Sequence, residues 1–262
     1  MPQRQVTQVQ ADSVEALRDI DDRFVRWQVD PAGIGAVWRR GNALVLSQTL
    51  DHHGAPVLGP TLLAMGGADE VRPLLEAAAA QIGVPPLRLT INGQAREALP
   101  SWWQYAEPPR VWDWMWTDEQ PPRQPGEESV TALPDDAGSR RDINGLLDLA
   151  NPASHGRPGE QRTLAWVGVR DVQGRLVATG VVTRLAGGAA HLRGVATLPA
   201  MRGRGLGAAV SARLSRIGLA ACGGRCSLGV YSDNTSAIRI YRRLGYRHLH
   251  TFVSGTVELS GK

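Results

Sequence analysis

A glycine- and arginine-rich segment between a predicted strand and a predicted helix carries the clearest chemical signal. It reads LPAMRGRGLGA from Leu198 to Ala208. Its glycines let the backbone approach a ligand closely and point successive N–H groups outward. The helix that begins at Gly205 adds partial positive charge, and Arg202 and Arg204 add full charges. The segment therefore predicts a pyrophosphate site; the alternative is a glycine-rich turn with solvated arginines.

Two common phosphate-binding motifs do not fit this segment. A Walker loop needs Gly-Lys-Ser/Thr, and the only lysine of the chain is Lys262. A dinucleotide-binding fold needs Gly-x-Gly-x-x-Gly in the first strand–helix turn of its domain. Here the glycines alternate and follow three earlier predicted strands.

A second motif begins at Asn234 and ends at Tyr246. Asn234, Ala237 and Tyr241 are spaced to share one face of a short helix, and Gly245 suits its C-terminal cap. Taken alone, Tyr241 could simply be a buried aromatic residue whose hydroxyl is hydrogen-bonded.

The two motifs and the strand order around them resemble the GNAT acyltransferase superfamily. The matching residues are Arg202-x-x-Gly205-x-Gly207 for its acyl-CoA signature, Asn234-x-x-Ala237-x-x-x-Tyr241-x-x-x-Gly245-Tyr246 for its C-terminal signature, and Val195-Ala-Thr-Leu-Pro199 for the strand before the loop. The last position of the C-terminal signature is Tyr where Phe is commoner. The resemblance covers about residues 135–254.

This resemblance implies an α/β fold with a mixed sheet that opens between the strands predicted at Ala190–Leu198 and Arg225–Tyr231. Acetyl-CoA would be the co-substrate, with its pantetheine arm in the opening. The implied binding residues are Val195, Ala196, Thr197 and Asn234 for pantetheine, and Arg202, Gly203, Arg204, Gly205, Leu206, Gly207 and Ala208 for the pyrophosphate. No metal is implied, and no His, Cys or acidic residues have metal-ligand spacing.

The implied reaction is direct transfer of an acetyl group to a primary amine of a small molecule. A strand N–H near Val195–Thr197 would stabilise the carbonyl oxygen, and Tyr241 would protonate the departing thiolate. Many relatives carry a glutamate base at the positions of His191 or Gly229. His191 is therefore the candidate base, on a predicted strand face with Arg193, Val195 and Thr197; the alternative is a partly exposed His191 with water removing the proton. His155, in the loop at 151–161, is a candidate substrate contact.

Charge is distributed unevenly along the 262 residues. The net charge is +4, but residues 1–120 carry −5 and residues 121–262 carry +9; residues 175–250 hold 12 Arg and one acid, Asp233. This segregation predicts a polyanionic ligand for the second half. CoA fits better than nucleic acid, because no aromatic residues interleave the arginines.

Both halves read helix, hairpin, strand, helix, strand, short helix, strand, which predicts two tandem GNAT-like domains. We place a degenerate copy at 1–120, a linker at 121–133 and the catalytic domain at 134–262. The first copy has Met65–Glu70 where the second has its arginine–glycine loop, and the two acids there would repel phosphate. The tryptophans of Trp102–Trp116 either line the acceptor site or, as favoured for Trp112, Trp114 and Trp116, fill their own core.

The expected elements are helices at 14–28, 69–82, 142–149, 205–221 and 234–243, and strands at 34–39, 43–49, 61–65, 86–91, 110–117, 163–170, 176–184, 190–198, 225–231 and 246–253.

No apolar run has the length of a membrane span, no secretory signal is visible, and two cysteines are too few for a disulfide scaffold. A cytoplasmic monomer or homodimer is expected, without nucleic acid or membrane as partner. The alternatives are an N-acyltransferase for longer acyl-CoA with an amino-acid or thiol-precursor acceptor, and a non-catalytic acyl-CoA sensor.

Overall fold

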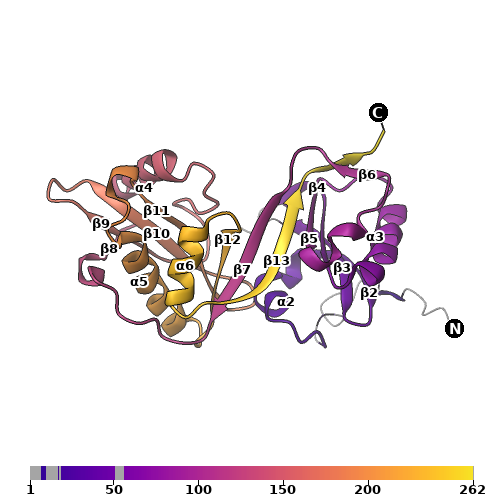
Figure 1. Ribbon diagram of the computed structural model, residues 1–262, viewed down its shortest axis with the longest axis horizontal. Helices are drawn as coiled ribbons and strands as arrows, with labels where there is room; N and C mark the ends of the chain where they lie inside the picture. Colours follow the sequence, from indigo (N-terminus) through magenta and orange to yellow (C-terminus); the bar gives the residue numbers. More distant parts are fainter. Residues whose placement is uncertain (1–6, 10–16, 18, 51–55, 262) are drawn as a thin grey trace. The chain divides into compact units, whose positions relative to one another are not determined.

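An antiparallel meander followed by a helix and a parallel strand occurs twice in the computed structural model, which describes residues 7–9, 17, 19–50 and 56–261. The chain divides into two units (Figure 1), the first formed by 1–113, 231–233 and 250–262 and the second by 114–230 and 234–249. The chain passes from one unit to the other within β7 (Arg110–Thr117) and again within β13 (Arg247–Gly255).

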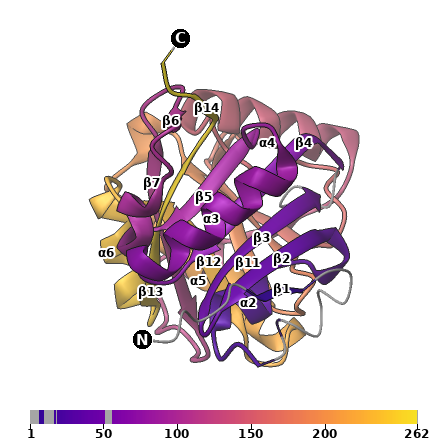
Figure 2. The same cartoon turned by 90° about the vertical axis from the view of Figure 1, so that its right-hand side faces the viewer.

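The first unit has its helix α3 packed on a mixed sheet (Figure 2). Its elements are β1 (Thr7–Val9), α2 (Arg23–Gln28), η1 (Pro31–Gly33), β2 (Ile34–Arg40), β3 (Ala43–Leu50), β4 (Pro56–Met65), α3 (Ala68–Ile82), β5 (Arg88–Asn92), η2 (Gly93–Ala98), β6 (Trp103–Tyr105) and β14 (Val257–Leu259). Strands β2, β3 and β4 are antiparallel neighbours, and β5 runs parallel to β4. Of the helix predicted at 14–28, α2 covers only Arg23–Gln28; residues 19–22 are not helical, and 14–16 and 18 lie outside the described residues.

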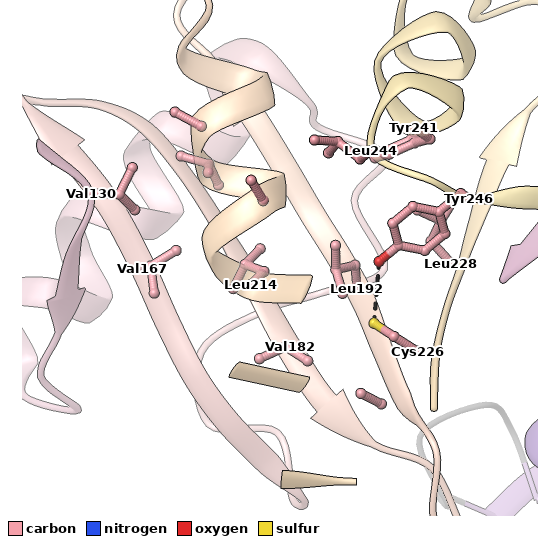
Figure 3. Packing of buried hydrophobic residues seen from close by; sticks show 14 of the residues in the cluster. Val130, Val167, Val182, Leu192, Leu214, Cys226, Leu228, Tyr241, Leu244 and Tyr246 are labelled. Carbon is pink, nitrogen blue, oxygen red and sulfur yellow. Dashed lines mark hydrogen bonds between the residues drawn. The ribbon is translucent and has the colours of Figure 1, made fainter. Parts of the chain in front are cut away.

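The second unit repeats this order. Its elements are η3 (Glu127–Ser129), β8 (Thr131–Leu133), α4 (Ala137–Ala150), β9 (Thr163–Arg170), β10 (Leu176–Arg184), β11 (Ala190–Thr197), η4 (Pro199–Met201), α5 (Leu206–Ala221), β12 (Cys226–Tyr231) and α6 (Thr235–Arg243). Helices α5 and α6 cover one face of the sheet with a large apolar cluster (Figure 3), and α4 covers the other. The mixed α/β sheet confirms the predicted fold class.

The domain bounds differ from those expected. Residues 250–255 of β13 belong to the first unit, because Phe252–Gly255 pair antiparallel with β5 and Val253 joins that unit's core. Part of the expected linker is regular structure: β8 pairs with β9, and Val130 beside it is buried. This part of the segment forms regular structure in spite of the prolines nearby, because its apolar residues are buried and its strand pairs with the edge of the sheet.

Helix α4 begins five residues earlier than expected. Asp136 is its N-cap, because the Asp136 carboxylate accepts a hydrogen bond of 2.7 Å from the N–H of Ser139. The aromatic strand β7 packs inward: Trp114 is fully buried, and Trp112 lies 4.8 Å from Phe252 between ring centroids. Trp116 is buried as well. Packing is thus the role favoured from the sequence for these three tryptophans, but Trp114 and Trp116 belong to the second unit and only Trp112 to the first.

Candidate functional site

The parallel strands β11 and β12 separate after three residue pairs. Ala190–Leu192 pair with Cys226–Leu228, and no further pair joins the two strands within the described part of the chain. Strand β11 nevertheless runs on to Thr197. Its backbone from Arg193 to Thr197 therefore presents an edge to which an extended ligand can add like a strand.

A β-bulge lies at this edge. Val181 of β10 pairs with Arg193 of β11, but Thr179 pairs with Ala196, so β11 contains one extra residue. Gly194 sits in the bulge with φ +58°, a conformation that favours glycine. The bulge reorients backbone N–H groups at the opening, where the carbonyl oxygen of an acyl group would need donors.

The bulge also overturns one expectation. His191, Arg193, Val195 and Thr197 do not share a face, because the extra residue reverses the alternation. Val195 packs against the cluster under α5, whereas Ala196 packs with α4. His191 and Arg193 therefore lie on the α4 face, and Val195 and Thr197 on the α5 face.

The loop after β11 ends at the N-terminus of α5. The first intrahelical hydrogen bond runs from the Ala209 N–H to the Gly205 carbonyl, so the preceding N–H groups of the turn have no helical partner. Gly203 and Gly205 both have φ +79°, and a Cβ added to either would meet nothing within 4 Å. An open cradle of N–H groups at a helix N-terminus fits a pyrophosphate.

The two arginines of this loop differ. The Arg202 guanidinium donates hydrogen bonds of 3.3 Å to the carbonyl oxygens of Thr197 and Ala150. It thereby ties the loop to the end of β11 and to the C-terminus of α4, where a cation is favourable. Both arginines are exposed, and Arg204 lies between Gly203 and Gly205. Because the Arg202 guanidinium already binds two carbonyl oxygens, Arg204 is the stronger candidate to meet a phosphate.

Asn234 and Tyr241 are positioned by α6. The Asn234 Oδ1 accepts from the Ala237 N–H (3.2 Å) and from the Ser236 hydroxyl (3.0 Å), so Asn234 caps the helix. Its amide NH₂ remains a donor for a ligand. Tyr241 is 8% exposed, and burial raises its pKa to about 12, although the hydroxyl of Ser211 acts in the opposite direction. Tyr241 is thus a neutral phenol that can donate a proton.

His191 is buried, with 7% of its surface exposed, so the alternative of a partly exposed strand residue is wrong. Its Nδ1 lies 2.9 Å from the hydroxyl of Ser227 on β12, and that hydroxyl donates to the Ala190 carbonyl. With Ser227 donating its single proton to the Ala190 carbonyl, His191 Nδ1 is the donor in their contact, and in this tautomer Nε2 carries the lone pair.

The loop at 151–162 lies against β11 on the α4 face. A Cβ added to the buried Gly156 would come within 3.1 Å of the Arg193 Cβ. Glu160 lies 3.7 Å from the Arg193 guanidinium, and its other oxygen accepts from the Arg157 N–H. His155, the expected substrate contact, is exposed. Sequence reasoning missed Glu160, whose signal was that it is the only acid between Asp148 and Asp171.

In the described part of the chain, no helix is both long and apolar enough to cross a membrane. The same residues contain no group of three or more His, Cys, Asp or Glu side chains arranged to hold a metal ion.

A family model described as "Acetyltransferase (GNAT) family" matches residues 109–246, slightly more than half of the chain. Three solved structures are similar in fold. A GNAT-family protein from Novosphingobium aromaticivorans has 24% identity and TM-score 0.54, covering 85% of this chain and 91% of its own. A GCN5-related N-acetyltransferase from Sphaerobacter thermophilus has 17% identity and TM-score 0.59, covering 94% and 85%. A tandem GNAT protein from the clavulanic acid biosynthesis pathway has 13% identity and TM-score 0.53, covering 98% and 99%. No protein with a curated description matches the sequence.

Proposed function

The chain belongs to the acetyltransferase (GNAT) family and is an acyltransferase, and from that premise we propose that it transfers the acetyl group of acetyl-CoA to a primary amine of a small molecule. The observation that carries this proposal is the separation of β11 from β12 beside an open cradle of N–H groups at the α5 N-terminus. These two features meet the needs of one extended ligand with a pyrophosphate.

The residues present fit acetyl-CoA in chemistry as well as in shape. The backbone edge of Val195–Thr197, which β12 does not pair beyond Leu192 in the described part of the chain and where Arg202 holds only the Thr197 carbonyl, would pair with the amides of the pantetheine arm. Asn234 would donate its NH₂ to that arm. The N–H groups of Gly203–Ala208 would hold the pyrophosphate, with Arg204 adding charge. The excess of arginine in residues 175–250 supports a polyanionic co-substrate.

The acceptor amine must lose a proton before it attacks, because an alkyl ammonium has no lone pair. We assign its removal to Nε2 of His191. The new C–N bond forms as the C–S bond breaks. The ammonium nitrogen loses two protons on the way to the amide: His191 takes the first before the attack and passes it to water, and the second passes to water after the attack. Tyr241 gives a proton to the departing thiolate. A backbone N–H at the Gly194 bulge would stabilise the charge on the carbonyl oxygen.

The first unit is proposed not to bind CoA. Its parallel strands stay paired from Thr61–Arg88 to Ala64–Ile91, one residue before β4 ends. They leave no edge like that of β11. The first turn of α3 also carries Asp69 and Glu70, which would repel phosphate. The degenerate character of this copy remains a proposal.

The test is release of CoA thiol from acetyl-CoA in the presence of a panel of amines, with the N-acetyl product identified by its mass. Butyryl- and octanoyl-CoA in parallel reactions distinguish an acyltransferase for longer chains. We expect turnover with acetyl-CoA that falls at least tenfold in Tyr241→Phe, since positioned acids contribute about 100-fold or more. CoA binding by calorimetry with no acetylated product from any amine would favour a sensor instead.

A further inference from the structure

Two buried serines stand one turn apart on α5, and each lies beside a tyrosine. Ser215 donates a hydrogen bond of 2.8 Å to the Ser211 carbonyl and lies 2.8 Å from the Tyr246 hydroxyl. Because Ser215 has a single proton, Tyr246 must donate to Ser215. The Cys226 thiol, 3.2 Å from the same phenol (Figure 3), must then donate to Tyr246. Every donor in this chain of groups is used.

The Ser211 hydroxyl is different. Its residue is only 1% exposed, yet its Oγ has no hydrogen-bond partner among the residues that the structure describes. A buried hydroxyl without a partner is uncommon, because it loses its bonds to water on folding. The Tyr246 network is complete without Ser211, which leaves the other tyrosine as the group that Ser211 can serve.

That other tyrosine is Tyr241. Its ring packs against the ring of Tyr246 at 5.8 Å between centroids, and it joins the same apolar cluster as the α5 residues on either side of Ser211. The Ser211 hydroxyl is the one side-chain group that counters the effect of burial on the Tyr241 phenol. Ser211 stands one helical turn before the serine that contacts Tyr246, and Tyr241 packs on that same Tyr246; both Ser211 and Tyr241 are buried.

We propose that Ser211 is a positioning residue that orients the Tyr241 phenol and donates a hydrogen bond to its oxygen when Tyr241 protonates the departing thiolate. In this step the tyrosine O–H bond breaks and an S–H bond forms, and the phenolate later recovers a proton from water. A phenolate in a dry site needs a fixed donor. This inference rests on the proposed acid role of Tyr241.

The test compares Ser211→Ala with its neighbour variant Ser215→Ala, which removes an equally buried hydroxyl from the Tyr246 network. A hydrogen bond to a charged group predicts a loss of about 10- to 100-fold in kcat for Ser211→Ala, with KM for acetyl-CoA within twofold of wild type. Ser215→Ala should keep kcat within twofold and lower only the melting temperature. Ser211→Thr, which keeps the hydroxyl, should recover most of kcat; Ser211→Cys, closer in size but a weak donor, should recover part of it.

A double variant separates this inference from the proposed function. In the Tyr241→Phe background, Ser211→Ala should change kcat less than twofold, because the hydroxyl then has no phenol to serve. If Tyr241→Phe loses activity but Ser211→Ala keeps it, or lowers kcat by the same factor in both backgrounds, the role of Ser211 is overturned while the acid role of Tyr241 stands. If Tyr241→Phe keeps full kcat, the acid role fails and the inference falls with it.

Discussion

The Ser227 hydroxyl determines which nitrogen of His191 carries the proton. Ser227 donates to the Ala190 carbonyl and therefore accepts from His191 Nδ1, 2.9 Å away. His191 and Ser227 are opposite each other in the last parallel stretch before β11 and β12 separate. The register of the two strands thus sets the tautomer in which Nε2 could serve as the proposed base, at the beginning of the opening.

Replacing His191 by Ala should lower kcat/KM by about 100-fold near neutral pH, because a positioned base is lost. Initial rates from pH 6 to 9 check this expectation. Ser227→Ala should cost less, since it removes control of the tautomer and not the base. Thr183→Val is the matched control, because it removes a buried hydroxyl that donates to the His191 carbonyl and not to the ring. A loss below threefold across this range in His191→Ala would leave water as the base.

Replacing Gly205 by Ala should raise KM for acetyl-CoA by about tenfold, equal to roughly 1.4 kcal/mol. An L-residue at φ +79° is strained, and its Cβ would enter the open cradle. Gly223→Ala is the control, because Gly223 also has positive φ with open space around it but follows the other end of α5. Both variants should lose about 1–2 kcal/mol of stability. If the two variants had the same KM for acetyl-CoA, the cradle would not be part of the binding site.

Cys222 and Cys226 should not react with thiol reagents until the protein unfolds. Both are buried, and burial raises the pKa of each thiol, that of Cys226 to about 12. At pH 8 roughly one Cys226 in 10,000 would then be a thiolate. Titration with a disulfide reagent in the absence of CoA should detect no reactive thiols before guanidinium is added and two after it is added. Rapid labelling of Cys226 in the native protein would contradict its burial beside Tyr246.

Asp22→Asn should destabilise the first unit at neutral pH. Burial raises the pKa of the Asp22 carboxyl, but hydrogen bonds from His250 (2.7 Å) and the Val25 N–H lower it overall from its ordinary 3.8. A lowered carboxyl pKa stabilises the fold above 3.8, and this contribution is lost as pH falls through the lowered value. Urea unfolding should show a deficit of roughly 1 kcal/mol at pH 7 that shrinks below pH 4. Asp22→Ala should show a further deficit at all pH values, because it also removes the N-cap of α2.

Several features of this protein could be predicted because they depend on residues that are close together in the sequence. The glycines at 203 and 205 require positive φ, Asn234 is a helix cap, and the apolar period of α5 depends on neighbours a few residues away. Such features are short in range, so the order of elements and the family could be predicted. The short strands β6, β8 and β14 were not predicted, because they form only through pairing with strands that are distant in the sequence.

The tertiary structure determines on which face of the sheet each side chain of the candidate site lies. An extra residue in β11 is a property of its pairing with β10, and it alone places His191 and Val195 on opposite faces. The proton on His191 depends on Ser227 from another strand, and the carbonyls that hold Arg202 come from β11 and α4. The sequence by itself determined which residues could do chemistry. Strand register and packing decided their direction, because contacts between residues distant in the chain leave no periodic trace along it.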